Sequence, residues 1–327
     1  MQSNISIAEK EIEVAKRLFV DGYLPGPIKC SCGETNFNIN NDSSNHTSLC
    51  CFRCSNYKYR KKYSIRINSF YSLFSFTLLR IVSELISCFI CKEYNVEKAL
   101  KYVAGSLNYN ISNKLIYKIY REMRIIIHKY MRFVYETEIF AKENANGFYS
   151  IDESLIGHKN GNQLWLFGAI NNISKEFRIE VCFERNTDTM KKFIEKYIPI
   201  GNTIITDGFP SYNFLDQEGS GYNHIKHIHG GGDFGFGVES TSHIESIWSQ
   251  IKGRIKSNYY SVPQKNLMLF IREIREAEYK IKLKYKSNSE KIRDFFECYK
   301  FLSDVNDVKL EKNIFFDESV SEDSDDD

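Results

Sequence analysis

The segments FYSIDES (148–154), QLWLFGAIN (163–171) and EFRIEVCFE (176–184) decide the fold of this chain. Each is rich in β-branched and aromatic residues, and short polar stretches separate them, which predicts three strands joined by tight connections. A helical segment at 188–197 and a further strand, TIITD (203–207), follow. This order predicts an α/β domain with a mixed sheet flanked by helices.

On the C-terminal side of these strands the sequence is helical again. Apolar periodicity predicts helices from about 243 to 256 and from about 264 to 284. Before them, HIKHIH (224–229) predicts a short strand and GGGDFGFG (230–237) a loop. On such a strand His227 and His229 would share a face, and we interpret the histidine cluster, which begins at His224, as a group that positions substrate or packs.

On the N-terminal side, apolar periodicity predicts helices over 6–20 and 70–90, the second with an ion pair between Arg80 and Glu84. Residues 96–135 predict two amphipathic helices separated by a polar turn. Such a pair is typical of a helix-turn-helix that binds DNA, and equally of two packed core helices.

Composition excludes several classes of protein. The 327 residues are 42% hydrophobic and 26% charged, which is typical of globular domains. We expect no membrane-spanning helix, because no uncharged stretch is long enough, and no secretion, because no basic region precedes an apolar run at the N-terminus.

The net charge is divided unevenly along the chain. Residues 311–327 carry a net charge of −7, which leaves +9 for residues 1–310. A basic body suits a polyanionic partner, and the acidic tail is either its competitor or an inert disordered end.

Five of the nine cysteines lie within 25 residues of one another, a pattern typical of metal binding in a reducing compartment. The pairs Cys30-x-Cys32 and Cys51-x2-Cys54 predict a structural Zn²⁺ site in a zinc ribbon. Because the first pair is one residue shorter than usual, Cys50 or His46 is an alternative ligand, and free buried thiols are a further alternative. Lys61 and Lys62 follow the second pair and suit either phosphate contacts or a solvated loop.

Two aspartates lie at the ends of predicted strands. Asp152 follows the run FYSI, and Asp207 ends the apolar strand TIIT just before Gly208. An acid at the carboxyl end of a central strand points into the crevice where open α/β sheets bind ligands. For Asp207 alone, however, the role of a turn former would be the simpler interpretation.

A third acid, Glu245, leads a mainly basic face of the predicted helix 243–256. Glu245, Ser249, Lys252 and Lys256 recur beside an apolar stripe that contains Trp248. Such a helix can place one carboxylate against the sheet while its lysines face a phosphate backbone, although an ordinary surface helix with Glu245 in salt bridges would have the same pattern. Three converging acids could hold two Mg²⁺ or Mn²⁺ ions about 3.5–4 Å apart for phosphodiester displacement.

The order IDESLIGHK (151–159), LWLFGAI (164–170), TDGFPSY (206–212) and HIESIWSQIKGRIK (243–256) resembles the DDE transposase domain of Merlin-type elements and related bacterial insertion sequences. The resemblance covers residues 147–285 and implies an RNase H-like fold that cuts and joins DNA with metal ions. It implies that Asp152, Asp207 and Glu245 are the catalytic acids, that Trp248 packs the helix, and that Lys252 faces DNA.

Two departures from that family stand out. The family's Cys-Pro-x-Cys knuckle is shortened at Cys30, and Ser242 occupies the position where bacterial relatives often carry an asparagine.

The sequence therefore predicts a transposase that binds element ends and target sites in double-stranded DNA and assembles as a homodimer or higher oligomer on paired ends. A decayed copy that only binds DNA and an RNase H-like nuclease that cuts without joining are the alternatives. It would act in the nucleus of a eukaryotic host and otherwise in the cytoplasm. The predicted parts are an N-terminal helix and zinc ribbon (1–66), a helical DNA-binding or linker region (67–146), the catalytic domain (147–285) and a C-terminal segment with the acidic tail (286–327).

Overall fold

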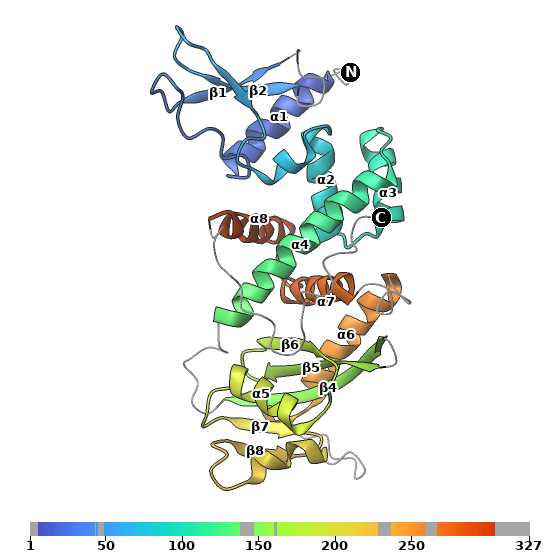
Figure 1. Ribbon diagram of the computed structural model, residues 1–327. Helices are drawn as coiled ribbons and strands as arrows, with labels where there is room; N and C mark the ends of the chain where they lie inside the picture. The colour runs from blue at the N-terminus through green and yellow to red at the C-terminus, as the bar shows by residue number, and fades with distance from the viewer. Residues whose placement is uncertain are drawn as a thin grey trace. The chain divides into compact units, whose positions relative to one another are not determined.

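The computed structural model of the protein describes residues 6–42, 44, 49–137, 147–159, 162–227, 237–258 and 267–304 (Figure 1). Within these ranges the chain forms two compact units. Unit 1 comprises the described residues up to Met123 together with Lys286–Asp304, and unit 2 comprises those of Arg124–Tyr285. His46, His229, the loop 230–236 and the tail 305–327 lie outside the described residues. No helix in the described ranges is both long and apolar enough to cross a membrane.

Unit 1 begins with helix α1 (Ile7–Val20) and a small antiparallel sheet of order β1-β2-β3. Ser6 and Glu9 form a reciprocal capping box that satisfies backbone N–H groups at the start of α1. The strands are β1 (Phe37–Asn41), β2 (Cys50–Cys54) and β3 (Lys62–Ser64). The cysteine-rich segment is therefore a three-stranded ribbon.

The helix predicted over residues 70–90 is interrupted. A 3-10 helix, η1 (Phe70–Phe74), precedes the α-helix α2 (Leu79–Ile90). The buried carboxylate of Glu11 accepts hydrogen bonds from the backbone N–H groups of Leu79 (2.8 Å) and Arg80 (3.3 Å), and so caps α2 from outside the helix. The predicted Arg80–Glu84 pair is wrong, because Arg80 Nε lies 3.5 Å from Oε1 of Glu11.

The two amphipathic helices predicted for residues 96–135 are present as α3 (Val96–Leu107) and α4 (Asn113–Thr137). Ser112 caps α4 by accepting the N–H of Leu115 at 3.2 Å. Sequence reasoning missed helix α8 (Asn288–Asp304), whose Phe296 stacks on Tyr23 at a centroid distance of 4.1 Å. This contact joins the end of the described chain to the core of unit 1.

The mixed sheet predicted for unit 2 is confirmed, with the strand order β6-β5-β4-β7-β8. Antiparallel pairing joins β4 to β5 and β5 to β6, and parallel pairing joins β4 to β7 and β7 to β8. The strands are β4 (Phe148–Lys159), β5 (Asn162–Asn171), β6 (Phe177–Cys182), β7 (Thr203–Thr206) and β8 (Asn223–Lys226). This is the strand order of an RNase H-like fold.

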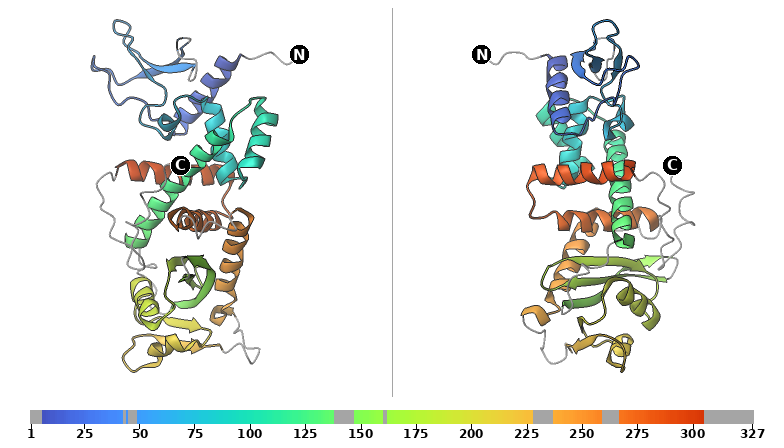
Figure 2. Two further views of the ribbon diagram at one scale, coloured as in Figure 1. Left: turned by 45° about the vertical axis from the view of Figure 1, so that its right-hand side comes forward. Right: turned by 90° about the vertical axis from the view of Figure 1, so that its left-hand side faces the viewer.

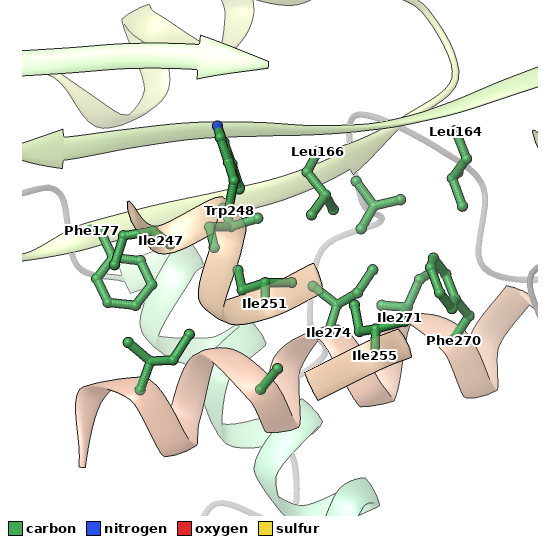
Figure 3. Close-up of a cluster of buried hydrophobic side chains, with 14 of the residues drawn as sticks. Leu164, Leu166, Phe177, Ile247, Trp248, Ile251, Ile255, Phe270, Ile271 and Ile274 are labelled. Carbon is green, nitrogen blue, oxygen red and sulfur yellow. The ribbon is translucent and has the colours of Figure 1, made fainter. Parts of the chain in front are cut away.

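Helices cover both faces of this sheet. Figure 2 shows α5 (Thr187–Tyr197) on one face and α6 (Ser242–Asn258) on the other. Helix α7 (Leu267–Lys282) packs against α6, and the 3-10 segment η2 (Pro210–Asp216) packs against α5. The core between the sheet, α6 and α7 contains Leu164, Leu166, Trp248, Ile251 and Phe270, all buried (Figure 3). This core fixes α6 against β4 and β5.

Candidate functional site

Asp152 and Asp207 meet at the carboxyl ends of two neighbouring parallel strands. Ser150 of β4 pairs in register with Ile205 of β7. Continuing this register by two residues brings Asp207, directly after β7, beside Asp152. Because side chains alternate along a strand, residues in register on adjacent strands share a face. The two aspartates therefore lie on the same face of the sheet.

A tight turn holds the carboxylate of Asp207. The backbone N–H of Phe209 donates to its Oδ1 at 2.9 Å, and Gly208 has a φ of 80°, which favours glycine. The hydroxyl of Thr206 accepts the Gly208 N–H at 3.3 Å and lies 2.9 Å from Nε2 of His224. Nδ1 of His224 in turn lies 2.8 Å from Oδ1 of Asp216. His224 thus supports the turn from β8 and lies on the opposite face from Asp207.

Helix α6 reaches Asp152 through Trp248. The indole Nε1 donates to Oδ2 of Asp152 at 2.9 Å. Gly168 of β5 lies opposite Asp152 in the sheet, and a Cβ built on it would lie 2.7 Å from Cζ2 of Trp248. Only glycine leaves room for the indole at this position. The pairing of a small residue on β5 with a large one on α6 therefore sets the distance between the helix and Asp152.

A buried polar cluster holds the segment that leads into α6. The hydroxyl of Ser150 donates to the carbonyl of Ser240 at 2.9 Å. The side-chain amide of Asn172 donates to Oγ of Ser150 and to the carbonyl of Val238, both at 2.7 Å. These bonds tie the start of α6 to β4 and β5. Glu245 follows in the first turn, where it is exposed and accepts a hydrogen bond from the Thr241 hydroxyl at 3.3 Å.

Asp207 and Glu245 act electrostatically on Asp152. Burial first, and the charges of Asp207 and Glu245 to a smaller extent, raise the pKa of Asp152 to about 6. The N–H groups of Glu153 and Trp248 oppose this shift. The three side chains do not form a closed ligand group, because in the described part of the chain only the cysteines of unit 1 have three ligand atoms within 4.8 Å of one another.

The four predicted DNA-contacting lysines lie on α6 and on the ribbon of unit 1. Lys252 lies half-buried on α6, and the side chain of Lys256 lies outside the described part of the chain. In unit 1, Lys62 is paired with Asp42 at 2.9 Å, and Nζ of Lys61 lies 3.5 Å from the hydroxyl of Ser31. Both of these lysines are exposed on the ribbon.

The ribbon brings together three of the four predicted zinc ligands. Cys30, Cys32 and Cys54 have sulfur atoms within 4.8 Å of one another, and the sulfurs of Cys32 and Cys54 lie 3.6 Å apart. The backbone N–H of Cys32, followed by the hydroxyl of Tyr63, lowers the pKa of the Cys30 thiol to about 6. A low thiol pKa favours the thiolate that binds metal.

Cys51 lies outside this group, which corrects the prediction that it is the fourth ligand. Since side chains alternate along β2, Cys51 and Cys54 face opposite sides of the ribbon. The alternative ligand Cys50 is buried beside Glu11 and is not in the group either; its burial raises the pKa of its thiol to about 12. His46 lies outside the described residues.

Sequence reasoning missed a second group of residues behind the acids. Glu153 is buried and pairs with Arg185 at 3.1 Å. Burial raises the pKa of Glu153 to about 7, and the charge of Arg185 opposes this shift. No motif marks Arg185, which lies between β6 and α5. Glu153 directly follows Asp152 in the sequence, but this adjacency does not identify its partner.

The mixed sheet places Asp152 and Asp207 at adjacent strand ends, and the facing helix α6 bears Glu245. Residues 148–279 match the family model of the ISXO2-like transposase domain, which confirms the insertion-sequence resemblance. The chain is similar to the HTLV-2 integrase catalytic core domain in complex with magnesium (13% identity, TM-score 0.31, 45% of this chain and 96% of that chain). It is also similar to the catalytic core domain of BIV integrase (15% identity, TM-score 0.28, 47% and 97%). No curated protein matches the chain.

Proposed function

We propose that the protein is a DNA transposase that cleaves and joins phosphodiester bonds through Asp152, Asp207 and Glu245. The observation that carries the proposal is the attachment of α6 to Asp152 through Trp248, at a distance of 2.9 Å between Nε1 and Oδ2. This bond brings the helix that bears Glu245 to the strand ends that bear the two aspartates. The match of residues 148–279 to a transposase domain supports the same conclusion.

The donor set suits Mg²⁺ or Mn²⁺. All three side chains are carboxylates, the hard oxygen ligands that these ions prefer. The upward shift in the pKa of Asp152 includes repulsion from Asp207 and Glu245, and a bound cation would relieve that repulsion. When bound, such ions supply an activated nucleophile and stabilise the leaving oxygen of the phosphodiester.

The residues of the chain have distinct roles in this proposal. Asp152 and Asp207 hold the ions from adjacent strands, and Glu245 completes the ligand set from the helix. Trp248 orients Asp152 by occupying its Oδ2. Lys252, seven residues after Glu245 and therefore on the same side of α6, contacts the DNA phosphates.

Unit 1 would bind the terminal inverted repeats. The ribbon presents Lys58, Arg60, Lys61 and Lys62, all exposed, next to the three-cysteine group. A Zn²⁺ ion held by Cys30, Cys32 and Cys54 would fix this small sheet, whose strands are only three to five residues long. We further propose that the protein acts as a homodimer or larger assembly, because both ends of an element must be joined together.

Nicking of a duplex that contains an element end tests the assignment. Asp207→Asn should abolish nicking in Mg²⁺ while changing DNA affinity by less than about threefold, because the substitution removes a ligand charge and leaves unit 1 intact. Asp188→Asn, an exposed acid in the first turn of α5, is the matched control and should nick normally.

Unchanged nicking by Asp207→Asn would refute the assignment of this residue. If the wild-type chain binds end DNA but does not nick it, the protein is a DNA binder without catalysis. A strand-transfer assay with a pre-nicked end then separates a transposase from a nuclease that only cuts.

A further inference from the structure

The guanidinium of Arg185 connects two strands and the turn after β7 behind the proposed catalytic site. Its Nε lies 3.1 Å from Oε1 of Glu153, whose side chain is fully buried on β4. On another side it lies 4.9 Å from the ring centroid of Trp165 on β5. On a third side it lies over the ring of Phe209, which follows β7, at 3.7 Å.

The contact with Phe209 leads directly to Asp207. The backbone N–H of Phe209 donates to Oδ1 of Asp207 at 2.9 Å. A ring held in place by the guanidinium restrains the backbone of residue 209, and this restrains the one carboxylate oxygen that the N–H contacts. In this arrangement Oδ1 accepts the backbone N–H, and Oδ2 is the oxygen that would bind a ligand.

We propose that Arg185 is a positioning residue for Asp207 and acts through the ring of Phe209. This inference rests on the proposed function, because it assumes that Asp207 binds the catalytic metal ion. Arg185 itself contacts neither metal nor DNA in this proposal. It transmits the fixed position of Glu153, the immediate neighbour of Asp152, to the turn that bears Asp207, and so keeps the two aspartates at a constant separation.

The chemistry of the side chain explains why arginine is needed. The guanidinium is planar, so it can stack on the Phe209 ring while its edge pairs with the Glu153 carboxylate. A lysine would keep the charge and the ion pair, but its ammonium has no plane to stack on the ring. Arg185→Lys is therefore the informative change, because it separates stacking from charge.

The test measures Mn²⁺ binding to the full chain by electron paramagnetic resonance and, in parallel, nicking as a function of Mn²⁺ concentration. Arg185→Lys should raise the half-saturating Mn²⁺ concentration by about fivefold to tenfold, since loss of the planar stacking on Phe209 weakens the restraint on Asp207. The Michaelis constant for DNA should stay within about twofold of wild type, because Arg185 does not contact the substrate in this proposal.

The matched control is Arg178→Lys. Arg178 is also a buried arginine that pairs with an acid, Glu176, and lies over an aromatic ring, Tyr135. A loss of general stability would appear in both variants as a lower unfolding temperature. Only the variant at Arg185 should change the metal dependence.

A double-mutant cycle with a second variant, at Phe209, tests the same connection from Arg185 to Asp207 in case Arg185→Lys is poorly folded. Phe209→Leu should raise the half-saturating Mn²⁺ concentration to a similar extent, and the double variant should be no worse than either single one. Additive effects, or an unchanged metal dependence in Arg185→Lys, would overturn the role of Arg185. Absence of nicking by the wild-type chain would instead overturn the proposed function.

Discussion

Trp248 on α6 donates its indole N–H to Oδ2 of Asp152 on β4, across a distance of 2.9 Å. This bond joins two residues that lie 96 positions apart in the chain. It explains why a tryptophan follows Glu245 by three residues: the same helical turn that presents the glutamate also orients the first aspartate.

Trp248→Phe keeps an aromatic ring against Gly168 but removes the indole N–H. A hydrogen bond to a charged group contributes about 1.5–3 kcal/mol, so we expect the rate of nicking to fall by about tenfold or more. The free energy of unfolding should fall by less than the activation free energy of nicking rises. Equal rates for the variant and wild type at every metal concentration would show that the bond does not position Asp152.

Gly168→Ala should displace the Trp248 ring, because the added Cβ would lie 2.7 Å from Cζ2. We expect the free energy of unfolding, measured in urea, to fall by about 1–3 kcal/mol. Gly253→Ala on α6 is the control: nothing lies within 4 Å of its added Cβ, and alanine should stabilise the helix by about 0.5–1 kcal/mol. A destabilised Gly253→Ala with an unaffected Gly168→Ala would contradict the packing described for the indole.

Zinc content should depend on Cys30, Cys32 and Cys54. Because the sulfur atoms of these residues lie within 4.8 Å of one another, Cys32→Ser and Cys54→Ser should each lose the metal during purification. Cys51→Ser should keep it, since Cys51 faces the other side of β2. Elemental analysis of the purified chain measures the zinc per molecule, and loss of zinc from Cys51→Ser alone would reject the three-cysteine site.

Acid should destabilise unit 2 through His128 of α4. Burial, assisted by the nearby arginines Arg275 and Arg272, lowers the pKa of His128 to about 3. Below the unfolded pKa of about 6.5 the unfolded chain takes up a proton that the folded chain does not, so the free energy of unfolding decreases as the pH falls.

The contribution of His128 is at most about 1.4 kcal/mol per pH unit between roughly pH 6 and pH 4. His128→Gln removes this titration and should flatten the pH dependence of urea unfolding relative to wild type, whatever its effect at neutral pH. Parallel curves for the two proteins would exclude His128 as the cause.

Much of the fold of unit 2 could be predicted from local pattern. The strand segments, α5 and α6 follow from the alternation and the helical periodicity of their own residues, and the mixed sheet follows from their order. The same patterns marked Asp152, Asp207 and Glu245 as candidates. Their mutual proximity is a tertiary property, and only the register between Ser150 and Ile205 brings the two aspartates side by side.

The predictions from the sequence were wrong or incomplete where tertiary structure determines which residues a side chain contacts. Arg80 pairs with Glu11 rather than with Glu84, because the buried Glu11 carboxylate caps α2 and lies closer to Arg80. Cys51 was grouped with Cys54 from spacing alone, but the extended conformation of β2 turns the two side chains apart. Arg185 carries no local signal, since its role depends on Glu153 of β4, Trp165 of β5 and Phe209 after β7.

The central claim is that Asp152, Asp207 and Glu245 bind the same metal ions. Binding of Mn²⁺ to the full chain, followed by electron paramagnetic resonance, tests it without requiring DNA cleavage. We predict that Asp152→Asn, Asp207→Asn and Glu245→Gln each weaken Mn²⁺ binding by about tenfold or more, whereas Asp188→Asn binds as wild type does. Equal Mn²⁺ affinity in wild type and in all three site variants would contradict the account.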